Sequence, residues 1–220
     1  MIAVTGIGWL TRKEYGCLFS KINEPHEGFD TLYSYFKDKS YFSCPVKNFS
    51  RFDTISKMTC FSAALALKDA GISYSADQKK DIGIFGSNEA GCLESNLNYF
   101  QDYIESGRIL ARGNLFIYTL PSIPLAEASI HFGLCGPLLH LFFNEKRIPS
   151  LLSFAGESIT GGETPSILAV SAEETDAICF VIKQEDDTSS GKNTGLQNVI
   201  AAAGDTYTFD EMINAFKGIV

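Results

Sequence analysis

The 220-residue sequence has few of the features on which metal-binding, disulfide-bonded and membrane-spanning proteins depend. Its six cysteines form no CxxC pair and its three histidines have no HxH or HxxxH spacing, so we predict neither a zinc site nor any other metal or cofactor. We interpret the cysteines as reduced thiols of a cytoplasmic protein. No segment reaches the ~20 apolar residues of a membrane span, and the N-terminal MIAVTGIGWL lacks the basic region of a signal peptide.

Basic residues are also scarce. The 18 Lys and Arg residues are outnumbered by 26 Asp and Glu residues, which gives a net charge of −8. Binding to a phosphate backbone requires clustered basic charge, so we expect no nucleic-acid partner. The composition, 45% hydrophobic and 20% charged, is that of an ordinary globular protein. The length favours one large domain, or one domain with an appendage.

The sequence contains none of the short motifs that specify the common phosphate, acyl-serine and zinc-protease mechanisms. No P-loop, GxSxG or HExxH segment occurs. TGIG at residues 5–8 lacks the third glycine of a dinucleotide-binding loop, because Thr11 stands at that position. We therefore interpret these glycines as a turn that leaves a short strand over 2–7.

Apolar periodicity and breakers predict strands that alternate with helices, which is typical of a layered α/β sheet. Residues 10–50 contain Pro25 and Pro45 and are predicted to be mostly loop and short helix. The helix at 90–105 carries Leu93, Leu97 and Phe100, with Ile104, on one stripe. The predicted strands are 2–7, 81–86, 138–143, 166–170, 177–183 and 196–203. The predicted helices are 54–70, 90–105, 124–131, 149–160 and 208–217.

Five segments in order resemble the N-terminal half of the β-ketoacyl-acyl carrier protein synthases. They are TGIG (5–8), SRFDTISKMTCFSAALALKDAGI (50–72), DIGIFGSNEAG (81–91), IPLAEASIHFGLCGP (123–137) and ILAVSAEE (167–174). The resemblance implies one half of a thiolase fold, with three α/β/α layers around a five-stranded mixed sheet of strand order 3-2-4-5-1. A short C-terminal strand and helix would complete the chain.

The resemblance also implies a division of the chain. Residues 1–183 would form the synthase-like domain, 184–195 a polar turn, and 196–220 a strand-helix element packed on the same domain. The family's full chain is nearly twice as long and carries its catalytic histidines in the C-terminal half. His131 and His140 match none of those positions, so we interpret both as structural.

The position of the family's nucleophilic cysteine is occupied here by a carboxylate. Nine residues after Gly136 the chain has Glu145, preceded by Asn144. A carboxylate cannot replace a thiolate as the acyl acceptor at neutral pH, so no catalytic residue is expected. Cys135 lies before the strand, at the wrong end for a nucleophile. Pro149 predicts that the following helix begins late or has a distorted first turn.

A half-fold leaves an apolar face that must be covered by a partner. We expect this interface on the segment 138–143, through Leu138, Leu139, Leu141, Phe142 and Phe143. The leading hypothesis is a non-catalytic subunit of fatty acid or polyketide-type biosynthesis. It would be similar to the chain-length factors and would pair with a full-length β-ketoacyl synthase or with itself.

Two alternatives remain open. In the first, Glu145 replaces the glutamine of the loading synthases and decarboxylates a malonyl thioester, although the histidines that assist this reaction are absent. In the second, the chain is a module that binds an acyl chain or an acyl carrier protein. Its acidic surface is against the second alternative, since carrier proteins are themselves acidic.

Overall fold

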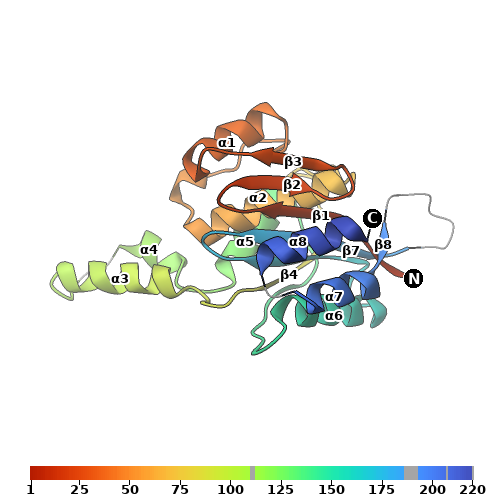
Figure 1. Cartoon of the computed structure of the whole chain (residues 1–220). Coiled ribbons are helices and arrows are strands. Elements are labelled where there is room, and N and C mark those ends of the chain that lie inside the picture. The colour runs from red at the N-terminus through yellow and green to blue at the C-terminus, as the bar shows by residue number, and fades with distance from the viewer. Residues whose placement is uncertain (110–111, 186–192, 207, 220) are drawn as a thin grey trace.

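The computed structural model describes residues 1–109, 112–185, 193–206 and 208–219, which fold into one mixed sheet with helices on both faces (Figure 1). The strands are β1 (Ile2–Leu10), β2 (Glu14–Cys17), β3 (Ile22–Pro25), β4 (Gly83–Ser87), β5 (Leu138–His140), β6 (Ser166–Ala172), β7 (Ala177–Gln184) and β8 (Thr194–Gly195). The helices are α1 (Phe29–Asp38), the 3₁₀ turn η1 (Phe49–Arg51), α2 (Thr54–Asp69), α3 (Leu93–Glu105), α4 (Gly113–Ile117), α5 (Ile123–Phe132), α6 (Arg147–Thr160), α7 (Leu196–Gly204) and α8 (Phe209–Gly218).

The strand order is β3-β2-β1-β7-β6-β4-β5, and β8 also pairs with β1. Within it, the run β5-β4-β6-β7-β1 is the expected order 3-2-4-5-1, which is confirmed. The sheet is nevertheless larger than the five strands expected, because the β2–β3 hairpin extends it beyond β1. β4 is parallel to β5 and β6, whereas β7 is antiparallel to both β6 and β1, so the sheet is mixed.

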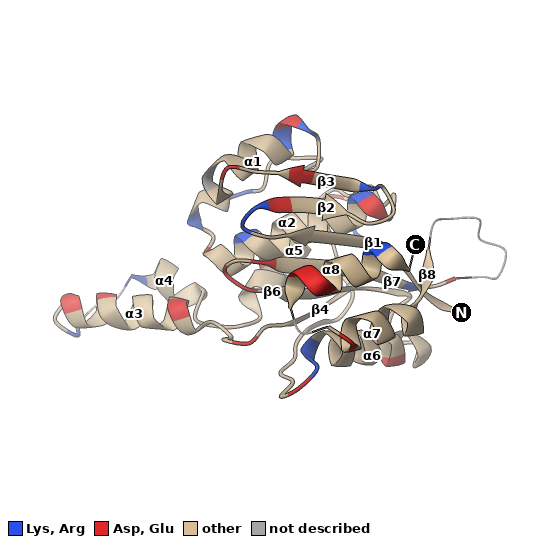
Figure 2. Ribbon diagram, in the orientation of Figure 1, with Lys and Arg blue, Asp and Glu red and all other residues tan. Residues whose placement is uncertain are grey.

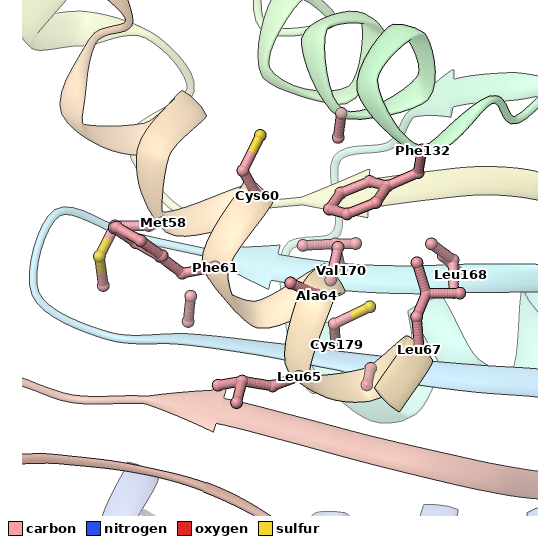
Figure 3. Packing of buried hydrophobic residues seen from close by; sticks show 14 of the residues in the cluster. Met58, Cys60, Phe61, Ala64, Leu65, Leu67, Phe132, Leu168, Val170 and Cys179 are labelled. Atoms are coloured by element: carbon pink, nitrogen blue, oxygen red, sulfur yellow. The ribbon is translucent and has the colours of Figure 1, made fainter. Parts of the chain in front are cut away.

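Alternate side chains of the central strands enter two separate cores, because successive residues of a strand point to opposite faces. Leu168 and Val170 pack with α2 and α5, whereas Ile167 and Ala169 pack with α6, α7 and α8. Figure 3 shows the first of these cores, with α2 crossing the strands that carry Leu168, Val170 and Cys179. The result is the expected three-layer α/β/α arrangement.

The two glycines of TGIG allow α2 to approach β1 closely. A Cβ atom on Gly6 would lie 2.3 Å from the Ala66 carbonyl oxygen, and one on Gly8 would lie 2.4 Å from the Ala66 nitrogen. Both glycines lie inside β1, which continues to Leu10, so the expected turn leaving a strand at 2–7 is wrong. Their role is helix–sheet packing.

Three other segments differ from expectation. Residues 10–50 contain the β2–β3 hairpin in addition to the expected loops and short helix, which is α1, and the strand expected over 138–143 ends at His140. The strand expected over 196–203 is helix α7. Its buried residues Leu196, Val199 and Ala203 recur at intervals of three and four, which is the period of a helix and not of a strand. Part of the expected polar turn, 186–192, lies outside the described residues.

Pro149 does not disturb α6. The helix begins at Arg147, two residues before the proline, and the Ser150 nitrogen donates the first helical hydrogen bond to the Lys146 carbonyl oxygen at 2.9 Å. Proline is tolerated here because the first amides of a helix have no intrahelical acceptor. The expected late start or distorted first turn is therefore wrong.

None of the helices in the described parts of the chain combines the length and apolar character needed to cross a bilayer.

Candidate partner interface and the adjoining cleft

The turn between β5 and α6 is where the sequence places the family's nucleophile. Asn144 and Glu145 lie in this turn, and both are exposed. The Glu145 carbonyl oxygen accepts a hydrogen bond from the Ser150 hydroxyl at 3.4 Å. Lys146 follows in the left-handed conformation, with φ of 47°, and directly precedes α6. The chain thus turns sharply from strand to helix, with an exposed carboxylate in the turn.

A cleft of about 810 Å³ opens beside this turn. Its walls come from the start of α3, the start of α6, the end of β6 and the segment that contains α7 and α8. Lys146 and Arg147 line the cleft. Asn144 and Glu145 are not among the described residues that line it. Those lining residues include neither a cysteine nor a histidine.

The cleft is acidic, and an ion pair in it ties α6 to the sheet. An Arg147 guanidinium nitrogen lies 2.9 Å from Glu173 Oε1, which also accepts a hydrogen bond from the Glu89 amide at 2.9 Å. Burial raises the pKa of Glu173, and these two contacts oppose that rise. A hydrogen bond to Glu174 raises the pKa of Glu94. The cleft therefore offers carboxylates and ion pairs formed by Arg147.

No cysteine lies in this turn or among the described residues that line the cleft. Burial raises the pKa of Cys17, Cys60 and Cys179, so these thiols remain protonated at neutral pH. Cys92 donates from Sγ to the Thr119 carbonyl oxygen at 2.7 Å. Cys135 is exposed, but it lies before β5, whereas the turn and the cleft follow that strand.

The segment expected to form the partner interface divides into two groups. Leu139 and Phe142 are exposed, by 37% and 71%. Leu138, Leu141 and Phe143 are half-buried and pack against the two cores. β5 pairs only with β4, and its outer edge has no strand partner among the described residues. The structure therefore leaves a free strand edge with two apolar side chains available.

A larger apolar surface lies on a protruding pair of helices, α3 and α4, which we call the arm (Figure 1). Successive turns of α3 carry four apolar residues, and we call this row the arm stripe. All four are exposed, by 41% to 59%, and no described residue of α3 is buried. The arm stripe consists of Leu93, Leu97, Phe100 and Ile104. Phe116 and Ile117 of α4, together with the following Leu120, are also about half exposed.

The arm is held by few but specific contacts. The Tyr99 and Phe116 rings pack 5.5 Å apart, and Arg112 forms an ion pair with Asp102 at 2.7 Å. The Ser95 hydroxyl donates to Asp53 Oδ2 at 2.9 Å, which links α3 to the start of α2. The apolar period of residues 90–105 predicts the stripe but not its exposure. The periodicity of one helix does not reveal whether another element covers its apolar side.

The comparison with solved structures identifies the fold. The ishigamide ketosynthase/chain length factor superposes with a TM-score of 0.61 at 12% identity, over 86% of this chain and 63% of that one. A β-ketoacyl synthase from Burkholderia phymatum superposes with a TM-score of 0.55 at 16% identity, over 84% of this chain and 59% of that one. A chain of a ketosynthase in complex with its chain length factor, from Xenorhabdus doucetiae, superposes with a TM-score of 0.52 at 10% identity, over 84% of this chain and 80% of that one. The chain has a ketosynthase fold.

These likenesses establish the fold alone, because the identities lie between 10% and 16%. This chain spans about three fifths of the first two structures, whereas it is similar in length to the matched chain of the Xenorhabdus complex. No protein-family model matches the sequence, and no curated protein is similar to it.

Proposed function

We propose that this chain is a non-catalytic, ketosynthase-like subunit that pairs with an active β-ketoacyl synthase in fatty acid or polyketide-type biosynthesis. The observation that carries the proposal is the exposed arm stripe on a ketosynthase fold. Soluble monomers seldom expose contiguous rows of large apolar side chains, and such rows usually belong to protein interfaces. Two of the similar structures, the ishigamide protein and the Xenorhabdus complex, contain a ketosynthase together with a chain length factor.

The turn before α6 supports the non-catalytic role in this proposal. Condensation by way of an acyl thioester needs a thiolate, and the turn offers Glu145 in its place. The cleft beside the turn has no cysteine or histidine among its described lining residues. A decarboxylase that uses Glu145 has less support for the same reason, and also because the exposed Glu145 does not line the cleft.

Charge favours a synthase over a second copy as the partner. α3 carries Glu94, Asp102 and Glu105 beside the arm stripe, and Figure 2 shows this acidic series along the helix. The whole chain has a net charge of −8, so two copies would repel each other on approach. A partner with basic residues around an apolar groove would be attracted to this surface and not repelled by it. The same acidic surface disfavours an acyl carrier protein as the principal partner.

The proposal is tested by co-expressing the tagged chain with each β-ketoacyl synthase of its source organism and measuring the ratio of the co-purified subunits. We expect one synthase to co-purify at 1:1. Phe100→Asp and Phe142→Asp should each reduce the recovered synthase at least about tenfold, because an unpaired charge would be buried at the interface.

The matched control is Tyr35→Asp, an aromatic-to-acid change at a side chain that is 49% exposed on α1. It should leave the ratio unchanged. If the Phe100→Asp and Phe142→Asp variants pair with the synthase as well as the wild type does, the proposed interface is wrong. If the chain forms only homodimers, the proposal of a synthase partner is wrong.

A further inference from the structure

A second cavity, of about 320 Å³, lies between the β1–β2–β3 side of the sheet and the end of α8. It shares no residue with the cleft beside α6. Its volume is at the lower end of the range for small-molecule sites. It is lined by Trp9, Cys17, Leu18, Lys21, Ile22, Asn23 and Lys217.

The cavity combines an apolar floor with a cationic rim. Trp9 and Leu18 are buried, whereas Lys21 and Lys217 are exposed. The Lys217 ammonium lies 5.3 Å from the centre of the Trp9 ring and 3.4 Å from Asn23 Oδ1. Among the described residues, neither lysine has a carboxylate within ion-pair distance. The rim is therefore locally cationic, although the chain as a whole has a net charge of −8.

Trp9 closes the floor of the cavity. Its ring is only 2% exposed, and its indole N–H is buried and has no acceptor among the described residues. The N–H therefore lies beneath the accessible surface of the cavity, and a ligand there would contact the ring and not the N–H.

We propose that this cavity binds a small amphiphilic carboxylate. The apolar tail lies on Trp9, Leu18 and Ile22, and the carboxylate is held between Lys21 and Lys217. A carboxylate suits the rim because it accepts charge-assisted hydrogen bonds from both ammonium groups. The short tail suits the floor because the cavity is small. This site does not depend on the proposed pairing with a synthase.

Trp9 is the only tryptophan in the sequence, so its fluorescence reports on this cavity without interference. Titration with octanoate should produce a saturable change in Trp9 emission. Octanamide, which has the same tail without the charge, should bind at least about tenfold more weakly. Inorganic phosphate alone should leave the emission unchanged, because it has no apolar tail.

Calorimetry on lysine variants tests the rim. Lys21→Gln and Lys217→Gln should each raise the Kd for octanoate about fivefold, and the double variant should raise it by more than either. Lys37→Gln, at an exposed lysine on α1, is the matched control and should leave the Kd unchanged.

Three results would each overturn the proposal: no saturable change up to about 10 mM octanoate, equal affinity for octanamide, or an unchanged Kd in the double variant. The octanamide comparison uses wild-type protein and so holds even if a variant folds poorly.

Discussion

At the scale of single residues, the surroundings of His131 determine when its side chain takes up a proton. The imidazole lies in a cluster of aromatic rings. Its ring centre lies 4.7 Å from that of Phe132, 5.5 Å from that of Tyr74 and 5.6 Å from that of Phe42. Its Nε2 atom is buried without a partner among the described residues.

Burial lowers the pKa of His131 from 6.5 to about 4. Below about pH 6.5 the unfolded chain therefore binds a proton that the folded chain accepts only near pH 4. The stability contributed by neutral His131 is complete above pH 6.5 and is lost as the pH falls towards 4. We expect His131→Phe to remove about 2 kcal/mol of this pH dependence between pH 7 and pH 4.5, measured by urea unfolding at pH 7, 5.5 and 4.5. A difference in unfolding free energy between the two proteins that stays constant with pH would contradict this assignment.

Gly8 offers a second test at the residue scale. A Cβ atom there would lie 2.4 Å from the Ala66 nitrogen, which belongs to the backbone of α2 and cannot move aside independently. We expect Gly8→Ala to lower the free energy of unfolding by about 3 kcal/mol or to prevent folding. Gly204→Ala is the control, because a Cβ atom on Gly204 would have no neighbour within 4 Å, and it should be neutral or slightly stabilising. Equal effects of the two changes in thermal unfolding would exclude the close-approach explanation.

At the scale of elements, the arm is where the structure departs furthest from the ordinary pattern of a surface helix. An apolar stripe usually faces the core, and α3 instead presents its stripe to solvent. The ring contact, ion pair and hydrogen bond that hold the arm use Tyr99, Asp102 and Ser95 of α3, which lie outside the stripe. The arm stripe should therefore contribute to pairing and not to the stability of the isolated chain.

This separation predicts different outcomes for two leucines. Leu97→Ala should change the free energy of unfolding by less than about 0.5 kcal/mol, because Leu97 is 59% exposed. Leu152→Ala, on the buried side of α6, should cost about 2–5 kcal/mol, because Leu152 is fully buried. Chemical denaturation of the isolated chain measures both. If Leu97→Ala proves as costly as Leu152→Ala, the arm stripe belongs to the core of the molecule.

Sequence alone predicts the elements that have a strong period and misses those that depend on tertiary contacts. The helices at α2 and α5 and the strands at β6 and β7 lie close to their expected ranges. The β2–β3 hairpin was missed because EYGC and INEP are short and carry no clear alternation of apolar residues. The segment 196–203 was expected as a strand that closes the chain, whereas the buried residues Leu196, Val199 and Ala203 recur with the period of a helix.

At the scale of the whole molecule, the resemblance predicts the central strand order, and the structure confirms it. The site is predicted less well. Counting residues places Glu145 in the turn before α6, but no pattern in the sequence indicates that the cleft is lined instead by Lys146 and Arg147. The interface was expected on 138–143, where only Leu139 and Phe142 are exposed. The exposure of the arm stripe could be found only from the structure, since it depends on how the other elements pack.

The proposed pairing is tested most directly by the native mass of the tagged chain purified from its source organism. We predict a complex that contains one copy of this chain and one β-ketoacyl synthase. The Phe100→Asp variant should yield the free chain under the same conditions. Recovery of the wild-type chain as a monomer, or as a homodimer without a synthase, would contradict the pairing.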